Sequence, residues 1–366
     1  MTDGGAVNSA IAFAGPVLSL RPRLGRLWYE WRNSGTRRVA VGALTDAVRG
    51  LPPQPGLPPP ARWSVQRVLS TETDVTVVVF GVETGAPLAV GRITEPDADD
   101  ADLVRNGQVL GELCAYERLG DWRSLLPVPL AAGRHGRRAY AVERAIAGQP
   151  ASRALRRSAR ISHVLDLGAA AITTLHRVTA VSRVIDDALL ERWVEAPLRL
   201  LEELGPVLGP GGSGTAVHRL ADRLREPLTG RPCVTAWTHG DYWCGNLLLD
   251  QRGERVAGIV DWGAARPDGL PVIDLLHLLL TTRATVGRVS LGDVVGATLR
   301  GGLQGSGERR LLARADWSWP VGTPDESAVV LLAWLGHVTS VMIKRPDYRT
   351  DRRWLERNVG TVLRHV

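Results

Sequence analysis

The sequence contains few cysteines, one lysine and no long apolar run. Three cysteines among 366 residues form no obvious disulfide framework, which is typical of a protein in the reducing cytoplasm. No apolar run reaches membrane-spanning length, so we expect no membrane partner. Lys344 is the only lysine, and the many arginines are not gathered with aromatic residues on one stripe. Despite a net charge of +7, we therefore do not expect a nucleic-acid partner.

Two motifs lie close together in the second half of the chain, at 238–246 (THGDYWCGN) and 259–262 (IVDW). Between them, apolar runs flank a polar turn with a glycine, which predicts two antiparallel strands. Folding back at this turn brings positions whose numbers sum to about 507 opposite each other, and Asn246 and Asp261 meet that condition. Together with Asp241 on the entering loop, they offer oxygen ligands for magnesium and one spare carboxylate.

The spacing of His-Gly-Asp, Asn and Val-Asp-Trp resembles the aminoglycoside phosphotransferase and choline kinase group, which are small-molecule relatives of the protein kinases. The resemblance implies an α+β, two-lobed protein-kinase-like fold with a small β-rich N-lobe and a larger, mainly helical C-lobe. It implies that Asp241 accepts the proton of the substrate hydroxyl. Asn246 and Asp261 would hold Mg²⁺ on the phosphates of ATP or GTP, and His239 and Asp274 would support the site structurally.

The sequence predicts three regions along the chain. Residues 1–58 are expected to form an N-terminal extension that ends in a stiff proline-rich linker. Residues 59–147 are expected to form the nucleotide-binding N-lobe with its hinge, and 148–366 the helical C-lobe with the catalytic loop and acceptor site. A short helix is predicted over 39–48. We interpret the extension as a packing or dimerisation appendage, which would allow a homodimer.

The predicted N-lobe departs from the kinase pattern in its phosphate-binding loop. A β-branched run at 75–80 and an apolar run at 88–93 predict two neighbouring strands. A Gly-x-Gly-x-x-Gly loop is absent, and the polar stretch 69–74 occupies its place. We expect backbone amides and the hydroxyl groups of Ser70 and Thr71 to contact phosphate there.

The lysine that kinases place on the second of these strands is also missing, and Arg92 occupies the matching position. A guanidinium group can bind phosphate with two N–H groups, so we expect Arg92 to replace the lysine. The alternative is a non-catalytic pseudokinase that binds nucleotide or a partner. On the following helix, Asn106 falls where kinases carry the glutamate that pairs with the lysine, although Glu112 is near. The sequence therefore leaves both an amide and a carboxylate as candidate partners of the strand cation.

Three further features concern ligand binding and packing. Segment 140–148 resembles the hinge of the family, and adenine is expected beside Glu143 and Ala145. The acidic run 95–102 is typical of a solvated loop, with a site for a cationic substrate as the alternative. His176 is expected to be a buried structural histidine.

The motifs favour a small-molecule kinase over a protein kinase. Gly240 stands where protein kinases carry an arginine that senses phosphorylation of the activation loop, so constitutive activity is expected. The resemblance implies a cytoplasmic, ATP-dependent O-phosphotransferase whose partner is a small hydroxylated acceptor, such as an aminoglycoside, another antibiotic, a sugar or a nucleoside. A polycationic aminoglycoside would bind best to an acidic protein, so the basic charge favours a neutral or anionic acceptor.

Overall fold

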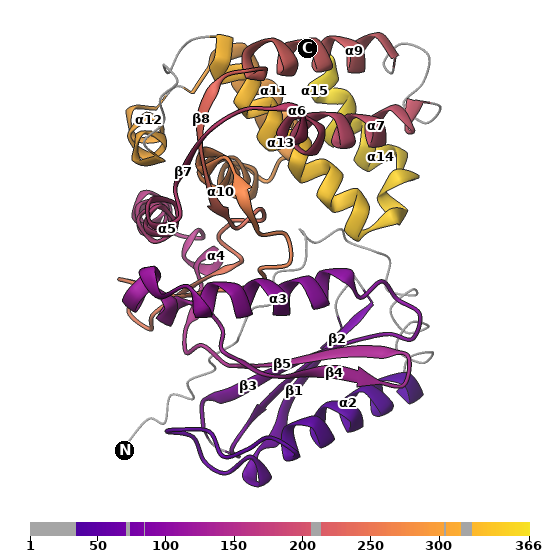
Figure 1. Ribbon diagram of the computed structural model, residues 1–366, viewed down its shortest axis with the longest axis vertical. Coiled ribbons are helices and arrows are strands. Elements are labelled where there is room, and N and C mark those ends of the chain that lie inside the picture. The colour runs from indigo at the N-terminus through magenta and orange to yellow at the C-terminus, as the bar shows by residue number, and fades with distance from the viewer. Residues whose placement is uncertain (1–33, 71–73, 84, 206–213, 304, 316–323) are drawn as a thin grey trace. The chain divides into compact units, whose positions relative to one another are not determined.

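The structure is a computed structural model that describes residues 34–70, 74–83, 85–205, 214–303, 305–315 and 324–366. The chain forms two compact units (Figure 1). The first contains the described residues up to Arg153 together with Gly245–Gly263. The second contains Ala154–Cys244 and the described residues from Ala264 to Val366.

The first unit is built on a five-stranded antiparallel sheet in the order β1-β2-β3-β5-β4. Residues 77–80 of its second strand are buried without alternation, because helices of this unit cover both faces of the sheet (Figure 1). The strands are β1 (Ser64–Ser70), β2 (Val75–Gly81), β3 (Pro87–Thr94), β4 (Pro129–His135) and β5 (Arg138–Arg144).

Helix α2 (Ser34–Arg49) packs on one face of this sheet. Its buried side chains recur at helical spacing and include Ala40, Leu44 and Val48, which join a core cluster with residues of β2, β3 and β5. Leu44 fills the space above Gly91, where an added Cβ would lie 2.9 Å from its Cδ2 atom. The helix predicted over 39–48 is thus confirmed, and it belongs to the core of the first unit. Residues 1–33 of the predicted extension lie outside the described residues.

Helix α3 (Ala101–Ala115) packs against β4 and β5, on the other face of the sheet. The 3₁₀ segment η2 (Glu117–Leu125) follows it and contacts α3 and β10. The buried positions of α3 recur every three or four residues, at Leu103, Asn106, Val109, Leu110 and Leu113. A buried polar residue within this apolar stripe is unusual and indicates a specific hydrogen-bonding role. A second, three-stranded sheet completes the unit, with β6 (Gln149–Pro150), β9 (Leu247–Leu249) and β10 (Val256–Ile259), and η1 (Pro60–Arg62) precedes β1.

The predicted hairpin is present as β9 and β10, and it is part of the first unit, whereas the prediction placed it with the helical lobe. Its register differs from the prediction by one residue. The backbone N–H of Val260 donates to the carbonyl of Asn246 at 2.9 Å, so Val260, and not Asp261, lies opposite Asn246. The hairpin also contains an irregularity between Val256 and Gly258, so no single sum of residue numbers describes all of its pairs.

The second unit is mainly helical and contains a three-stranded sheet in the order β11-β8-β7. Its principal helices are α5 (Ser158–Val178), α10 (Pro271–Gly287) and α13 (Pro324–Lys344). The remaining strands and segments are β7 (Val181–Val184), β8 (Pro232–Thr238), β11 (Arg266–Gly269), α6 (Asp187–Leu190), η3 (Glu191–Glu195), α7 (Ala196–Glu202), α9 (Gly214–Leu228), α11 (Leu291–Gly301), α12 (Ser306–Leu312), η4 (Ala313–Ala315), η5 (Pro346–Arg349), α14 (Arg352–Leu355), η6 (Glu356–Gly360) and α15 (Thr361–Leu363). The short α4 (Ala151–Ala154) lies in the chain where the units join.

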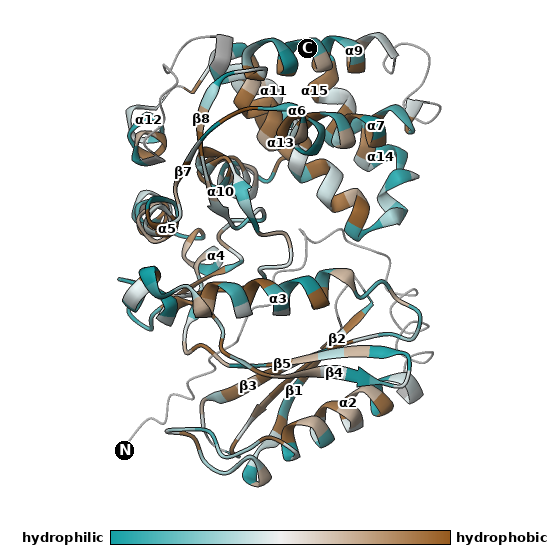
Figure 2. Ribbon diagram, in the orientation of Figure 1, coloured by the Kyte–Doolittle hydropathy of each residue, from teal (hydrophilic) through white to brown (hydrophobic). Residues whose placement is uncertain are grey.

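Helix α13 is strongly apolar (Figure 2). Over Glu326–Lys344 it is long and apolar enough, by length and composition alone, to cross a membrane, so the expectation that no such segment exists is wrong. Its apolar side chains are used in packing, because Leu331, Trp334 and Leu335 are fully buried in the second unit. The indole N–H of Trp334 also donates to the carbonyl of Asn358 at 2.8 Å. The composition of α13 is therefore explained by its place in the core.

Candidate functional site

The loop after β8 is anchored by Asp274 in the first turn of α10. The carboxylate of Asp274 accepts hydrogen bonds from the backbone N–H of His239 at 2.8 Å and of Gly240 at 3.0 Å, and it contacts Nε2 of His176 at 3.0 Å. Burial would raise the pKa of Asp274, but the hydrogen bond with His176 and the other contacts outweigh it and lower the pKa. These contacts fit the supporting role predicted for Asp274, and His176 is buried as expected.

Gly240 can only be a glycine in this loop. Its φ angle is +77°, and an added Cβ would lie 2.4 Å from the carbonyl oxygen of Ala264. The next residue is held by the ring of His239, because the backbone N–H of Asp241 donates to Nδ1 of His239 at 3.2 Å. The loop therefore has a fixed backbone from which Asp241 projects, and an arginine at position 240 would not fit.

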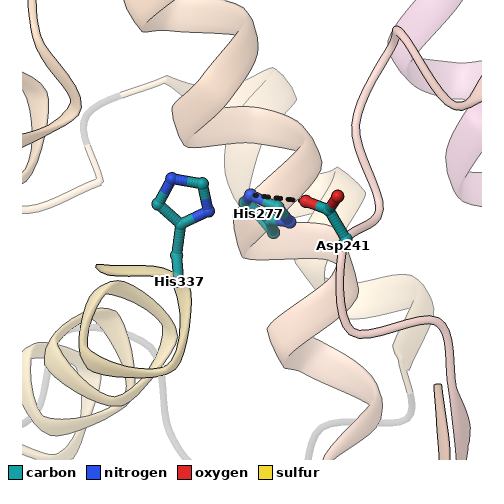
Figure 3. Close-up of side chains that lie close together, drawn as sticks. All are labelled: Asp241, His277 and His337. Carbon is teal, nitrogen blue, oxygen red and sulfur yellow. Dashed lines mark ion pairs between the residues drawn. The ribbon is translucent and has the colours of Figure 1, made fainter. Parts of the chain in front are cut away.

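Two imidazole rings lie beside Asp241 (Figure 3). Nε2 of His277, on α10, is 3.8 Å from Oδ1 of Asp241, and the ring of His337, on α13, has its centroid 4.7 Å from that of His277. Burial lowers the pKa of His277, and it lowers the pKa of His337 to about 3, so both rings are uncharged near neutral pH. Nε2 of His277 is buried and has no hydrogen-bond partner within the described residues.

Asp241 itself is ionised near neutral pH. Burial opposes ionisation, but His277, the positive charge of Lys344 and His337 outweigh burial and hold the pKa of Asp241 below its usual value. A carboxylate that is about a quarter exposed can accept a proton from a bound hydroxyl group. The loop therefore presents the charge state that the predicted role of Asp241 requires.

The neighbours of Asp241 were missed as site residues in the sequence. His277 follows Asp274 by three positions on one helix, so the two side chains lie on the same face, and this spacing was an available signal. His337 and Lys344 come from a helix almost a hundred residues further along the chain, and local patterns give no indication of their electrostatic interaction with Asp241.

The first unit contains the residues predicted to bind metal. Asn246 is buried directly before β9, and Asp261 follows β10 in the left-handed region, with φ of +69°. Such a conformation is uncommon for a residue other than glycine, and it turns the chain directly after the strand. The next side chain, Trp262, is fully buried, packs edge-on against Trp122 at 6.1 Å between ring centroids, and donates to the carbonyl of Ile259 at 2.9 Å. The turn that carries Asp261 is thereby fixed.

Arg92 on β3 lies between two carboxylates of the first unit. Its Nη2 is 2.5 Å from Oε1 of Glu143 on β5, and its Nη1 is 3.7 Å from Oδ1 of Asp261. Asn106 on α3 completes the network, because its Nδ2 donates to Glu143 at 2.7 Å and its Oδ1 accepts from the backbone N–H of Trp262 at 2.8 Å. The structure thus brings together four residues that the sequence singled out separately, while Glu112 is exposed on α3.

The structure uses the predicted hinge residues differently from the expectation. Glu143 lies inside the sheet, paired with both β3 and β4, and its carboxylate contacts Arg92. The backbone N–H of Ala145 donates to the carbonyl of Leu88 at 2.9 Å. The carboxylate of Glu143 and the N–H of Ala145 are thus engaged within the protein, and adenine beside these two residues stays a prediction. Ser70 ends β1, and Thr71 lies outside the described residues.

The acidic run 95–102 is compensated locally, which favours the solvated-loop interpretation over a site for a cationic substrate. Arginines of β4, β5 and the turn between them neutralise three of its carboxylates. The ion pairs are Arg138 with Glu95, Arg137 with Asp97 and Arg134 with Asp100.

The three cysteines are free. Cys244, inside the predicted catalytic loop, is buried, and its thiol contacts the hydroxyl of Thr282 at 3.3 Å. Burial raises the pKa of Cys244 to about 11, so the thiol stays protonated and unreactive near neutral pH.

Comparison with known proteins adds a family and a fold. A family model described as "Phosphotransferase enzyme family" matches residues 78–313, well over half of the chain, and includes Arg92, Asp241, Asn246 and Asp261. A search of curated proteins found no match.

Solved structures are similar to the chain over most of its length. A protein from Ralstonia eutropha JMP134, classed provisionally as an aminoglycoside phosphotransferase, is 14% identical with a TM-score of 0.53, and the match covers 89% of this chain and 97% of that one. The aminoglycoside phosphotransferase APH(3'')-Id from Streptomyces rimosus is 17% identical with a TM-score of 0.47, over 86% and 98% of the two chains. The same enzyme in complex with ADP and streptomycin gives 19% identity and a TM-score of 0.46, over 74% and 92%. The predicted α+β, protein-kinase-like fold is confirmed.

Proposed function

The chain belongs to the phosphotransferase enzyme family, and we propose that it is an ATP-dependent O-phosphotransferase acting on a hydroxyl group of a small molecule. The observation that carries this proposal is the position of Arg92. A kinase without its strand lysine needs another permanent cation beside the metal-binding aspartate, and the guanidinium group of Arg92 lies 3.7 Å from Asp261. This arrangement supports an active enzyme over a pseudokinase.

We assign the acceptor side of the reaction to Asp241. Its ionised carboxylate would accept a hydrogen bond from the attacking hydroxyl group and take its proton as the bond to phosphorus forms. The backbone around it is fixed by Asp274 and His239, so the cost of orienting the carboxylate is met during folding. Phosphoryl transfer needs little covalent chemistry from a protein, and such positioning is a main source of its catalysis.

We assign the donor side to residues of the first unit. Asn246 and Asp261 offer an amide oxygen and a carboxylate, a donor set that suits Mg²⁺, and both are held by a fixed backbone turn. When bound, the ion neutralises charge on the phosphates. Arg92 would contact a phosphate oxygen directly through its guanidinium group. Because Ala145 is engaged with Leu88, we place the purine edge at the backbone that follows it.

We propose a neutral or anionic acceptor. The charged or ionisable groups whose charges act on His337 are Asp241, His277 and Lys344, so the carboxylate is offset by a cation on this side of the catalytic loop. A polycationic aminoglycoside would need several carboxylates there, and the acidic run 95–102 is neutralised by arginines of its own unit. A sugar, a nucleoside or a hydroxylated carboxylic acid would meet no such charge conflict.

The proposal is tested by turnover with the full chain in Mg-ATP. ADP release is measured against a panel of neutral, anionic and cationic alcohols, and the phosphorylated product is identified by mass spectrometry. GTP serves as the alternative donor, and Asp241→Asn as the control for background hydrolysis. We expect acceptor-dependent ADP release that this variant abolishes. If Mg-ATP raises the melting temperature but none of the acceptors is phosphorylated, the pseudokinase is favoured.

A further inference from the structure

We propose that Asp241, His277 and His337 form a binding site for a divalent transition-metal ion such as Zn²⁺. Each residue offers one ligand atom, and these atoms all lie within 4.8 Å of one another. Figure 3 shows the three side chains brought together from the catalytic loop, α10 and α13. The residues are different from Asn246 and Asp261, which we assign to Mg²⁺.

The chemistry of the three ligands selects the metal. Two imidazole nitrogens and one carboxylate oxygen are a common set for Zn²⁺ at catalytic sites, whereas Mg²⁺ is held by oxygen atoms. An imidazole without charge has a lone pair to give, and transition metals bind it far better than magnesium does. This set should therefore discriminate strongly between the two kinds of ion.

A second observation points to a missing ligand at the same place. Nε2 of His277 is buried and lacks a hydrogen-bond partner within the described residues. A buried polar atom without a partner costs free energy, and a bond to a metal ion would remove that cost. The ring of His277 is 5% exposed, so its position is set by packing in α10.

The distances require only side-chain adjustment. In a tetrahedral zinc site with bonds of about 2.1 Å, the ligand atoms lie roughly 3.4 Å apart. The atoms Oδ1 of Asp241 and Nε2 of His277 are 3.8 Å apart, and the pairs with His337 lie within 4.8 Å. The pairs with His337 would have to close to this separation when the metal binds. Three protein ligands leave a fourth position for water or an acceptor oxygen.

One nearby charge opposes the metal. The ammonium group of Lys344, on the same helix as His337, acts on all three proposed ligands. Its charge offsets that of Asp241, so the metal gains less attraction than it would at a site with an unopposed carboxylate. Replacing Lys344 by an uncharged residue should therefore strengthen binding, which no purely structural role of the histidines predicts.

A metal ion bound at this site would block phosphoryl transfer. This consequence rests on the proposed function. A metal ion on Oδ1 of Asp241 withdraws electron density from the carboxylate, which makes it a weaker acceptor for the hydroxyl proton. Zn²⁺ would then inhibit phosphoryl transfer in the presence of excess Mg²⁺. Metal binding itself does not depend on the proposed function, so it is measured separately from activity.

The experiment uses Co²⁺ as a spectroscopic probe of the full chain, stripped of metal and held in excess Mg²⁺. We expect one equivalent of Co²⁺ to give the visible absorption of a four-coordinate site, which Zn²⁺ removes and further Mg²⁺ does not. His337→Ala and His277→Ala should each weaken Co²⁺ binding at least tenfold. Lys344→Met should tighten it at least threefold.

Two controls make the result specific. His218→Ala removes an exposed histidine on α9 and should leave the titration unchanged, and so should Asp261→Ala. Thermal unfolding checks that each variant is folded. If His277→Ala does not fold, the Co²⁺ titrations of His337→Ala and Lys344→Met decide whether the site exists. The absence of the absorption band, or its persistence in His337→Ala, would overturn the site. Binding of Co²⁺ by a chain that phosphorylates none of the acceptors would leave the site standing and remove only the proposed function.

Discussion

Glu143 on β5 is the acidic partner of Arg92, with 2.5 Å between Oε1 and Nη2. Kinases of the pattern that this chain resembles place that acid on the helix, where α3 carries the amide of Asn106 instead. Glu143 and Asn106 therefore act together. Glu143 holds the guanidinium group of Arg92, and Asn106 links Glu143 to the backbone of Trp262, next to Asp261. The position of the strand cation is thereby coupled to the turn that carries the predicted metal ligand.

Removing Glu143 should weaken nucleotide binding through Arg92. Glu143→Gln keeps the shape of the side chain but leaves the guanidinium group without its partner, so we expect the KM for ATP to rise severalfold. Glu112→Gln, which changes an exposed acid on α3, is the matched control and should leave KM unchanged. Steady-state kinetics with varied Mg-ATP measures both KM values. A rise in KM for Glu112→Gln but not for Glu143→Gln would instead identify Glu112 on α3 as the acidic partner of Arg92.

Arg92 should carry the phosphate contact. Arg92→Ala should reduce ATP affinity or turnover at least tenfold, about 1.4 kcal/mol, in a folded protein. Arg92→Lys should be partly active, because a point charge also binds phosphate from a shorter stem. Isothermal titration with a non-hydrolysable ATP analogue gives the affinities. Wild-type behaviour of Arg92→Ala would direct the search to two other arginines of the first unit, Arg67 on β1 and Arg105 on α3. If none of the three variants loses ATP affinity or turnover, the pseudokinase is favoured.

Asp241 should be essential for turnover but not for nucleotide binding. Asp241→Asn is expected to lower kcat by two or more orders of magnitude, about 3 kcal/mol or greater, with nearly unchanged ATP affinity. The pKa of Asp241 is lowered, so the wild-type kcat/KM should stay level from neutral pH down into the usual range for an aspartate. Near-normal turnover in the variant would remove Asp241 from the mechanism.

The metal ligands should be separable from the acceptor side. Asp261→Ala should abolish the dependence of nucleotide binding on Mg²⁺, and Asn246→Ala should weaken it, since carboxylate and amide oxygens are suited to this ion. Fluorescence titration of an ATP analogue at several Mg²⁺ concentrations measures the dependence. If ATP affinity in both variants still rises normally with Mg²⁺, the assignment of these residues is wrong.

His337 should make the protein less stable in acid. Its pKa is about 3 in the folded chain and near 6.5 when unfolded, so between these values the unfolded state binds more protons. Stability therefore falls as pH drops below about 6.5, by at most about 1.4 kcal/mol per pH unit from this group. His337→Asn should show a smaller loss of melting temperature between pH 7.5 and pH 5 than the wild type. An equal loss in both proteins would assign the effect to other groups, of which His277 is the first candidate.

Sequence reasoning worked where the determinants are local. The β9–β10 hairpin, the loop with Asp241, and the place of Arg92 on β3 follow from short motifs of neighbouring residues. The fold class follows from the same motifs. These features needed little knowledge of how distant segments pack.

The rest depended on contacts between distant segments. Arg92 and Glu143 are 51 positions apart, and the sequence alone assigned Glu143 to the purine instead. The grouping of His277 and His337 with Asp241 requires the packing of two helices. Counting residues from the turn could not fix the register of the hairpin, because an irregularity in β10 changes the pairing along it.

The burial of Leu44 against Gly91 has a consequence for how much of this chain is needed to fold. The family match starts at residue 78, inside β2, and ends at 313, before α13. A protein cut at those limits would lack β1 and α2, leaving Phe80 and Ile93 without their cover, and it would lose the central helix of the second unit. The segment matched by the family model is thus shorter than the segment that folds. Expression of residues 78–313 alone should yield aggregates.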